Sequence, residues 1–517
     1  MLLTNAKIII LIEYIMKLNF LSRHFASLLA VTAILLGTLT TSLLSSCSNE
    51  DLPATQVDPD NIDLMEPLTI EAVDDGEVDL YQDIQLPEPV YYSANGGEKQ
   101  EVTVVDEEAE EKVEYTTLNL KAGDKVQLFS RNTWLHDNEK SRGFSLSFET
   151  ACYVYGNVMS LITPNGNWAA NKEIKAPYAL ASLFSYTNIV THPTRQLLLP
   201  ATRLTKGCYS HMFSNSKIRV APELPANRLA ERCYSFMFNY CKNLKKAPAI
   251  KATHLANSCC GYMFWACEGL IEASELPATK MAESCYEFMF GWCTSLAAAP
   301  ELPATQLAND CYAGMFASCE SITKAPELPA TILASSCYST MFSGCTKLAE
   351  APVLPATELV DSCYSAMFSE TGLKVAPVLP ATTMARSCYE GMFGYCNELT
   401  QAPALPATEL AARCYAHMFT RCKNLTGTVE LPAEQLPERC YSFMFSGCAK
   451  LNSVKCMATT MTGDFALGSW LENAGTDESV GTRTLTHAAG TPWTVSDEYA
   501  RGTTDWFVPT GWTLVSM

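Results

Sequence analysis

Apolar positions recur with a fixed period over more than half of this 517-residue chain. The unit Leu-Pro-Ala-Thr-x-Leu-Ala-x-x-Cys-Tyr-x-x-Met-Phe-x-x-Cys-x-x-Leu-x-x-Ala-Pro recurs ten times, and residues 302–326 are a nearly clean copy. Neighbouring units are 26 residues apart, except for two intervals of 25, and a degenerate copy precedes them at residues 183–193. The first cysteines of the units are Cys208, Cys233, Cys259, Cys285, Cys311, Cys337, Cys363, Cys388, Cys414 and Cys440. One such unit cannot bury its own apolar face, so the period predicts a stack of coils, a solenoid.

The spacing within a unit predicts one helix and one short strand. From Leu307 to Cys319 the apolar residues fall at i, i+4, i+8 and i+12, with a parallel line one residue on. We interpret this segment as an amphipathic helix of about three turns. The residue equivalent to Thr305 is Thr in most units and Asn in one, and it would be the N-cap of this helix. The proline-rich remainder, Leu-x-x-Ala-Pro-x-Leu-Pro, predicts a short strand. The expected fold is therefore an α/β solenoid of about 26-residue repeats over residues 164–454.

The segments on either side of the repeats have other patterns. Residues 67–163 alternate apolar and polar positions in short runs separated by Asp-Gly and Asn-Gly turns. This period of two predicts a small all-β, sandwich-like domain. Residues 455–517 lose the 26-residue period and contain Trp470, Trp493, Trp506 and Trp512. We interpret them as a C-terminal cap that covers the open edge of the last coil.

The N-terminal segment predicts export. Basic residues follow Met16, an apolar run spans residues 25–44, and the chain then reads Leu-Ser-Ser-Cys, ending at Cys47. This order is typical of a secretory signal, and we expect residues 1–46 to be a signal peptide that begins at Met16. The ending resembles a bacterial lipobox, which makes Cys47 the expected lipid-attachment residue. Residues 47–66 are acidic and would form a flexible tether. An uncleaved transmembrane anchor is the alternative.

Charge is concentrated in one part of the chain. The formal net charge is −19, and residues 50–124 account for all of it, with 22 acidic and 3 basic residues. The repeats and the cap together are therefore nearly neutral. This distribution argues against a nucleic-acid partner, because binding phosphates requires a basic face.

Of the 22 cysteines, 18 occupy the two cysteine columns of the repeat, so the high cysteine content follows mainly from the number of coils. No Cys-x-x-Cys pair or pair of histidines at ligand spacing occurs, so we predict no metal site and no cofactor. Buried free thiols packed as small apolar groups are favoured over disulfides, although export would permit disulfides. The chain contains no phosphate-binding glycine loop or nucleophile elbow, so we do not expect an enzyme.

Aromatic residues at variable positions are the candidate binding residues. Tyr240, Trp292 and Tyr395 precede the second cysteine of their units, and Trp265 lies one position earlier. Stacked coils would align these side chains into a strip suited to a protein or a sugar. The alternative is that they only fill space between coils.

The repeat resembles the leucine-rich repeat of BspA-like surface proteins of Gram-negative bacteria. The likeness lies in Met315-Phe316-x-x-Cys319-x-x-Ile322-x-x-Ala325-Pro326-x-Leu328-Pro329 and in its ten copies. It implies a leucine-rich-repeat solenoid and a surface lipoprotein that binds a macromolecular partner in adhesion or protein–protein interaction. The alternative is a glycan-binding lipoprotein of a carbohydrate-capture system. We expect a monomer anchored in the outer membrane by its N-terminal lipid and exposed at the cell surface, with a periplasm-facing lipoprotein as the alternative location.

Overall fold

The computed structural model describes residues 62–105, 115–137, 142–148, 150–496 and 506–517. The predicted signal peptide, Cys47 and most of the predicted tether lie outside these residues. All described residues belong to one compact unit, Gln56–Met517. Within them, no helix has the length and apolar character needed to cross a bilayer.

Two β-sheets form the N-terminal domain. A seven-stranded sheet has the order β10-β9-β1-β6-β3-β4, and β11 also pairs with β9. A four-stranded sheet has the order β5-β2-β8-β7. The strands are β1 (Thr69–Ala72), β2 (Gly76–Gln82), β3 (Val90–Ala94), β4 (Gln100–Glu101), β5 (Thr116–Leu120), β6 (Lys125–Ser130), β7 (His136–Asp137), β8 (Arg142–Phe148), β9 (Cys152–Asn157), β10 (Ile189–Val190) and β11 (Leu197–Leu198).

The predicted β domain is present, but it is mixed and not purely antiparallel. Strands β1 to β9 pair antiparallel, whereas β10 and β11 come from the start of the repeat region and pair parallel with β9. Alternating buried positions are clear in β2, with Val78 and Leu80, and in β6, with Val126 and Leu128. The first coil of the repeat region thus continues the sheet of the N-terminal domain. A short 3-10 helix, η1 (Val158–Leu161), follows β9.

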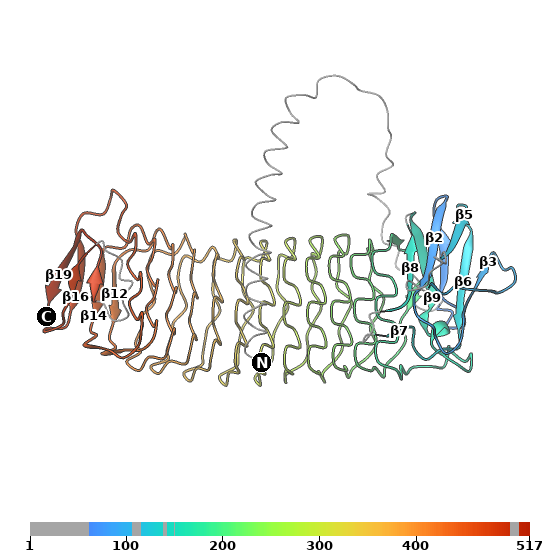
Figure 1. The fold of residues 1–517 in the computed structure, drawn as a ribbon, viewed down its shortest axis with the longest axis horizontal. Helices are drawn as coiled ribbons and strands as arrows, with labels where there is room; N and C mark the ends of the chain where they lie inside the picture. The colour runs from blue at the N-terminus through green and yellow to red at the C-terminus, as the bar shows by residue number, and fades with distance from the viewer. Residues whose placement is uncertain (1–61, 106–114, 138–141, 149, 497–505) are drawn as a thin grey trace, which may run out of the picture. The chain divides into compact units, whose positions relative to one another are not determined.

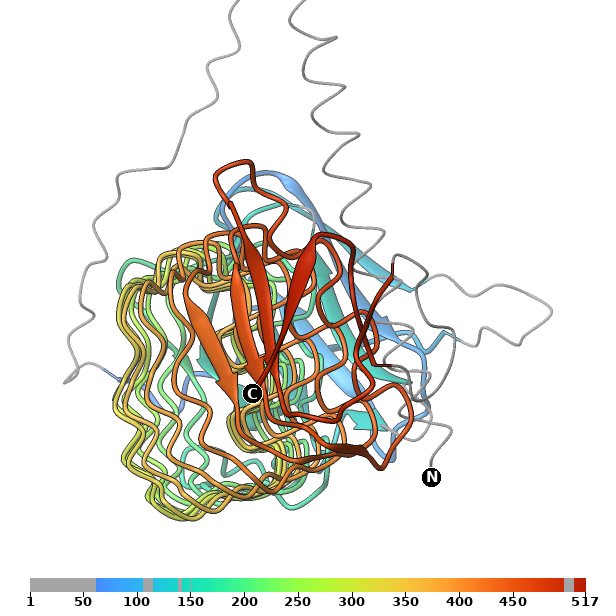
Figure 2. The same cartoon turned by 90° about the vertical axis from the view of Figure 1, so that its left-hand side faces the viewer.

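The repeat region forms a solenoid whose coils lie side by side along one axis (Figure 1). Viewed from its C-terminal end, successive coils overlie one another closely (Figure 2). Equivalent residues of neighbouring coils form parallel bridges, such as Lys280 with Gln306 and Lys324 with Glu350. The bridges next to the Ala-Pro pair lie where the sequence predicts a strand. The bridges that follow the threonine, such as Lys280 with Gln306, lie where the sequence predicts the start of a helix. Extended backbone at this point is the first indication that no helix follows.

The predicted helix in each repeat is wrong, and the fold is therefore not α/β. Between residues 308 and 319, alternate amides donate to the carbonyl three residues earlier. Examples are the Met315 amide to the Tyr312 oxygen at 3.2 Å and the Cys319 amide to the Phe316 oxygen at 3.0 Å. The amides between them leave the coil and donate to the next one, as Phe316 does to the Met341 oxygen at 2.9 Å. We call this stretch of each coil the turn segment.

Every fourth residue of the turn segment has a positive φ. In the coil around Phe316 these residues are Asp310 (φ 54°), Gly314 (60°) and Ser318 (59°). Gly314 is the third residue of its turn, the position at which a type II turn requires a positive φ. Two turn geometries therefore alternate along the segment. Every second amide donates to a carbonyl of the next coil. An α-helix would keep its amide hydrogen bonds within the segment.

Identical side chains stack through the interior. The phenylalanines from Phe184 to Phe445 form one continuous stack, with ring centroids 5.2 to 6.0 Å apart. A second stack contains the buried tyrosines and is interrupted where Cys260 takes the tyrosine position. We call the first the inner ladder. Stacked aromatic pairs add about 0.5 to 1.5 kcal/mol to the burial of the rings themselves.

The described cysteines are all buried and free. Those of the second column have a defined partner, because the thiol lies against the carbonyl of the inner-ladder phenylalanine in the preceding coil. The Sγ–O distance is 3.0 Å from Cys319 to Phe290 and 3.1 Å from Cys345 to Phe316. Burial raises the pKa of Cys345 to about 12, so the donor proton is held at neutral pH. The thiol column therefore links neighbouring coils by hydrogen bonds.

The two units that lack the second cysteine carry a hydroxyl in its place. Thr371 donates to the carbonyl of Phe368 at 2.8 Å within its own coil, and it lies 3.3 Å from the thiol of Cys396. Ser216 lies 3.5 Å from the thiol of Cys241. The hydroxyls of the short units therefore contact the thiol of the following coil, whereas the second-column thiols donate to a carbonyl of the preceding coil.

The C-terminal segment adds further parallel strands to the stack. The strands are β12 (Thr428–Leu431), β13 (Gln435–Leu436), β14 (Ser453–Cys456), β15 (Thr460–Met461), β16 (Arg483–His487), β17 (Thr494–Val495), β18 (Phe507–Val508) and β19 (Trp512–Ser516). Four of them form a parallel sheet of order β12-β14-β16-β19. The inner ladder ends on Trp470, whose ring centroid is 6.4 Å from that of Phe445 and 5.6 Å from that of Trp493.

Candidate binding surface on the turn segments

Each coil has three positive-φ residues on its turn segment, which we call the outward positions because most of them reach the surface, although some, such as Ala266 and Ser387, are buried. The buried cysteine, tyrosine, methionine and phenylalanine columns alternate with them along the chain. A left-handed backbone conformation costs a non-glycine residue about 1 kcal/mol or more. The interior is fixed by packing, so these outward positions are where the coils differ from one another.

The middle outward position contains a stack of four rings that the sequence analysis did not single out. His211, Phe236, Tyr262 and Phe288 occupy this position in four consecutive coils. Their neighbouring ring centroids are 4.7, 4.7 and 5.2 Å apart, with interplanar angles of 5°, 7° and 17°. We call this stack the outer ladder. All four side chains are half-buried and therefore reach the surface.

Glycines shape the end of the outer ladder. The next coil has Gly314 at the equivalent position, and a Cβ built there would lie 2.3 Å from Cε1 of Phe288. The glycine thus leaves the space that the ring of Phe288 fills. The middle position then continues with the small residues Thr340, Ala366 and Gly391 before aromatic residues return.

Two of the predicted site residues come together beside the outer ladder. Tyr240 and Trp265 meet edge to face, with centroids 4.8 Å apart and planes at 85°. Trp265 is also 6.4 Å from Tyr262 at 71°, and its Cδ1 lies 2.9 Å from the position that a Cβ on Gly291 would take. Tyr240 is 40% exposed, whereas Trp265 is half-buried.

The other two predicted residues are placed differently. Trp292 is half-buried in the coil after Trp265, at the same outward position as Tyr240. Tyr395 lies four coils further on and is 42% exposed. It belongs to a second cluster, in which the Arg421 guanidinium is 5.4 Å from the Tyr395 ring and His417 stacks on Phe443 at 4.8 Å. The four predicted residues therefore form two surfaces and not one strip.

The charges beside the two clusters differ in sign. Glu287 and Asp310 are partly buried next to the outer ladder, and burial raises the pKa of both carboxyls. The Tyr262 hydroxyl donates to Glu287 at 3.4 Å. The second cluster instead contains Arg421, together with Arg413 at 3.7 Å from the carboxylate of Glu390. Burial lowers the pKa of His211 and of His417, so both imidazoles are neutral at pH 7.

Ring orientation decides which contacts the outer ladder can make. Each inner member of the stack has both faces covered by its neighbours, so the ring edges are what it offers to a partner. Apolar edges and the Tyr262 hydroxyl suit the side chains of a protein surface. A sugar ring stacks on an open aromatic face, which the inner members do not provide.

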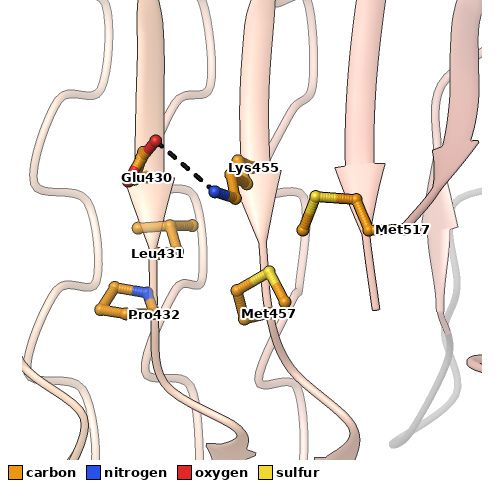
Figure 3. Close-up of a pocket in the computed structure, with 6 residues that line it drawn as sticks. All are labelled: Glu430, Leu431, Pro432, Lys455, Met457 and Met517. Atoms are coloured by element: carbon orange, nitrogen blue, oxygen red, sulfur yellow. Dashed lines mark ion pairs between the residues drawn. The ribbon is translucent and has the colours of Figure 1, made fainter. Parts of the chain in front are cut away.

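The described residues contain no group of three or more histidine, cysteine or acidic side chains that could hold a metal ion. A pocket of about 180 Å³ lies elsewhere, on the C-terminal sheet, between Glu430, Lys455 and Met517 (Figure 3). The outer ladder does not line this pocket, and its four rings are partly exposed at the surface.

The sequence contained a signal for the outer ladder. His211, Phe236, Tyr262 and Phe288 all precede the methionine of their units. If each segment is taken as a helix, this position is one of several variable surface positions. The four aromatic residues are then not expected to lie beside Tyr240 and Trp265. Comparison of the chain with protein-family models, with curated proteins and with solved structures gives no match.

Proposed function

We propose that this chain is a binding protein that engages a protein partner through the outer ladder and the adjacent Tyr240–Trp265 pair. The observation that carries the proposal is the four-ring stack on the outside of the solenoid. Aromatic side chains dominate the energetics of protein interfaces, particularly when they are rigid before the partner arrives. Rings already stacked on one another lose little freedom on binding.

We also propose that the repeat is of the leucine-rich class. Its Met-Phe-x-x-Cys-x-x-Leu-x-x-Ala-Pro core resembles that of BspA-like proteins, and its parallel coil-to-coil bridges suit such a solenoid. The lipid anchor at Cys47 and the location on the outer membrane facing the surroundings belong to the proposal as well. Protease treatment of intact cells tests the location. If the protein is exposed at the cell surface, the protease removes the solenoid and leaves periplasmic proteins intact.

Capture of a glycan is the alternative that the same aromatic residues invite. It requires an aromatic face to which a sugar can stack. The outer ladder offers such faces only at its ends, on His211 and Phe288, and Phe288 lies against Gly314. Protein binding is therefore the function that the geometry favours.

The experiment places the full-length protein on an array of extracellular proteins and on an array of glycans. We expect capture of one or a few proteins and no saturable glycan signal. The double variant Tyr240→Ala/Trp265→Ala should weaken the captured interaction at least tenfold, since removing an interface anchor costs about 2 kcal/mol or more. Saturable binding to glycans alone would replace the proposal by its alternative.

The second aromatic cluster supplies the matched control. Tyr395→Ala/Phe443→Ala also removes two aromatic side chains from turn segments, five or more coils away, and Tyr395 occupies the same outward position as Tyr240. This control should keep the affinity of the unmodified protein within about threefold. If both double variants lose binding equally while both remain folded, the outer ladder is not the binding surface.

A further inference from the structure

Strand β19 is the outermost strand of the C-terminal sheet, at the end of the stack (Figures 1 and 2). Two other edge strands of the described residues, β4 (Gln100–Glu101) and β7 (His136–Asp137), have two residues each, one of them acidic, whereas the edge strand β5 (Thr116–Leu120) has five uncharged residues, as β19 has. Short, charged edges discourage pairing with other chains. Strand β19 has five residues, and none between Trp512 and Met517 is charged.

The backbone of β19 directs hydrogen-bonding groups away from the sheet. The Met517 amide donates to the His487 carbonyl of β16 at 3.0 Å. The amide and carbonyl groups of successive residues point to alternate sides of a strand, so those of Thr513 and Val515 also point towards β16. The amides and carbonyls of Leu514 and Ser516 therefore face outward, and they are available to a further strand.

Both faces of β19 carry apolar side chains beside one hydroxyl each, Ser516 on one face and Thr513 on the other. Trp512 is buried and Leu514 is half-buried on the face that packs on the core. Val515 is 43% exposed and Met517 is 54% exposed on the other face. Beside Met517 the pocket of about 180 Å³ is lined by Met457, Leu431 and the Glu430–Lys455 ion pair, whose atoms are 3.7 Å apart (Figure 3).

We propose that β19 pairs antiparallel with β19 of a second copy of this chain, across a two-fold axis at Leu514. The backbone of Leu514 and Ser516 faces away from β16, and so does that of Trp512, whose amide already donates to the Pro509 carbonyl at 3.3 Å. Leu514 would therefore lie opposite Leu514 of the partner subunit, and Thr513 opposite Val515 of the partner subunit. The two four-stranded sheets would become one continuous sheet, which is a closed, isologous interface.

The absence of charge favours a second copy as the occupant. Two identical strands place each residue opposite its own symmetry mate or that of a neighbour, so a charged strand repels itself. A neutral strand with Thr and Val in the cross-strand positions gains from β-branched contacts instead. The inference departs from the monomer that the sequence analysis expects, and it does not depend on the proposed binding surface.

The test measures the mass of the purified full-length protein by light scattering over a range of concentrations. We expect a monomer–dimer equilibrium of modest affinity, because a single strand pair buries little area. Val515→Lys should shift the equilibrium to monomer by introducing two like charges near the axis. The matched control Asn119→Lys places the same charge on another five-residue edge strand, β5, and should leave the dimer unchanged.

Cross-linking tests the register. Leu514→Cys should form an intermolecular disulfide under mild oxidation, since directly opposed residues in an antiparallel pair have Cα atoms about 5.5 Å apart. Ser516→Cys should not, because it faces Trp512 of the partner subunit. A wild-type protein that is monomeric at every concentration overturns the proposal. A dimer that survives Val515→Lys, or one that cross-links at residue 516 and not at 514, does so as well.

Discussion

The interior and the outward positions of one coil follow opposite rules. The interior repeats the same cysteine, tyrosine, methionine and phenylalanine in coil after coil, and these side chains are almost completely buried. The outward positions change from histidine to phenylalanine, glycine, threonine or arginine, in a left-handed backbone conformation that favours only the glycine among them. The difference indicates that the interior determines folding, while the outward positions are free to determine what the protein binds.

Alkaline pH should separate interior from exterior most strongly. Burial raises the pKa of Cys345 and Cys414 to about 12 from an ordinary value of 9.0, and other interior thiols are raised as well. A raised folded-state pKa means that the stabilisation is complete below pH 9 and is lost as the pH rises towards 12. Each such thiol removes about 1.4 kcal/mol per pH unit in that window.

With many thiols titrating together, we expect the solenoid to unfold cooperatively between about pH 9 and 11, a window set by these pKa values. Tryptophan fluorescence and circular dichroism during a pH titration measure the transition. Replacing Cys293, Cys319 and Cys345 by alanine should move the midpoint upward. Thiolate absorbance that appears near pH 9 while the protein remains folded would show that the thiols are not held protonated by the interior.

The two ladders should differ in their contribution to stability. Phe316→Ala removes a fully buried ring of the inner ladder and should cost about 3 to 5 kcal/mol. Phe236→Ala removes a half-buried ring of the outer ladder and should cost about 1 to 2 kcal/mol, mostly its stacking contacts. Urea denaturation followed by fluorescence gives both values. Equal losses would contradict the division between a folding interior and a binding exterior.

Two glycines at the same outward position test what ends the outer ladder. Gly314 and Gly391 both have a positive φ, of 60° and 65°. A Cβ on Gly314 collides with Phe288, whereas on Gly391 its nearest neighbour is 3.8 Å away on Ala366. Both alanine variants should lose about 1 kcal/mol to backbone strain.

Gly314→Ala should lose more, because it also displaces Phe288 from the stack. Thermal unfolding of the two variants measures this difference directly. If the two variants have the same melting temperature, Phe288 is not held in place by the space above Gly314.

The smallest expected effect concerns the thiol hydrogen bonds. Cys319→Ala removes the donor to the Phe290 carbonyl, which keeps the Cys293 amide as a second donor at 3.1 Å. The loss should be about 1 kcal/mol beyond that of the removed sulfur. Cys319→Ser keeps a hydroxyl donor at this position and should recover part of it. Urea midpoints of the two variants decide, and a serine variant less stable than the alanine one would contradict this role.

Much of the interior could be predicted from the sequence, because identical residues at a fixed period can bury their apolar faces only by stacking. The helix was wrong for a reason that was visible in the spacing. Apolar residues at Leu307, Cys311 and Met315 keep an unbroken period of four, and each step of four on an α-helix advances about 40° past a full turn. A stripe with that period drifts off one face of a helix, but it suits turns that repeat every four residues.

The backbone conformation of the turn segment could not be predicted in the same way. Positive φ values are usually indicated by glycine or asparagine. Here most of these positions hold other residues, such as Asp310 and Ser318, because coil-to-coil hydrogen bonds fix the backbone. The outer ladder was missed for the same reason, while Tyr240 and Trp265 were found from their aromatic character alone.

Hydroxyl-radical footprinting of the protein, alone and with the protein captured on the array, tests the central claim most directly. The method reports solvent access to aromatic side chains one by one. We predict that the partner lowers labelling of Phe236, Tyr240, Tyr262 and Trp265, with Tyr395 and Phe443 unchanged. Protection confined to Tyr395 and Phe443, or to the N-terminal β domain, would contradict the assignment of binding to the outer ladder.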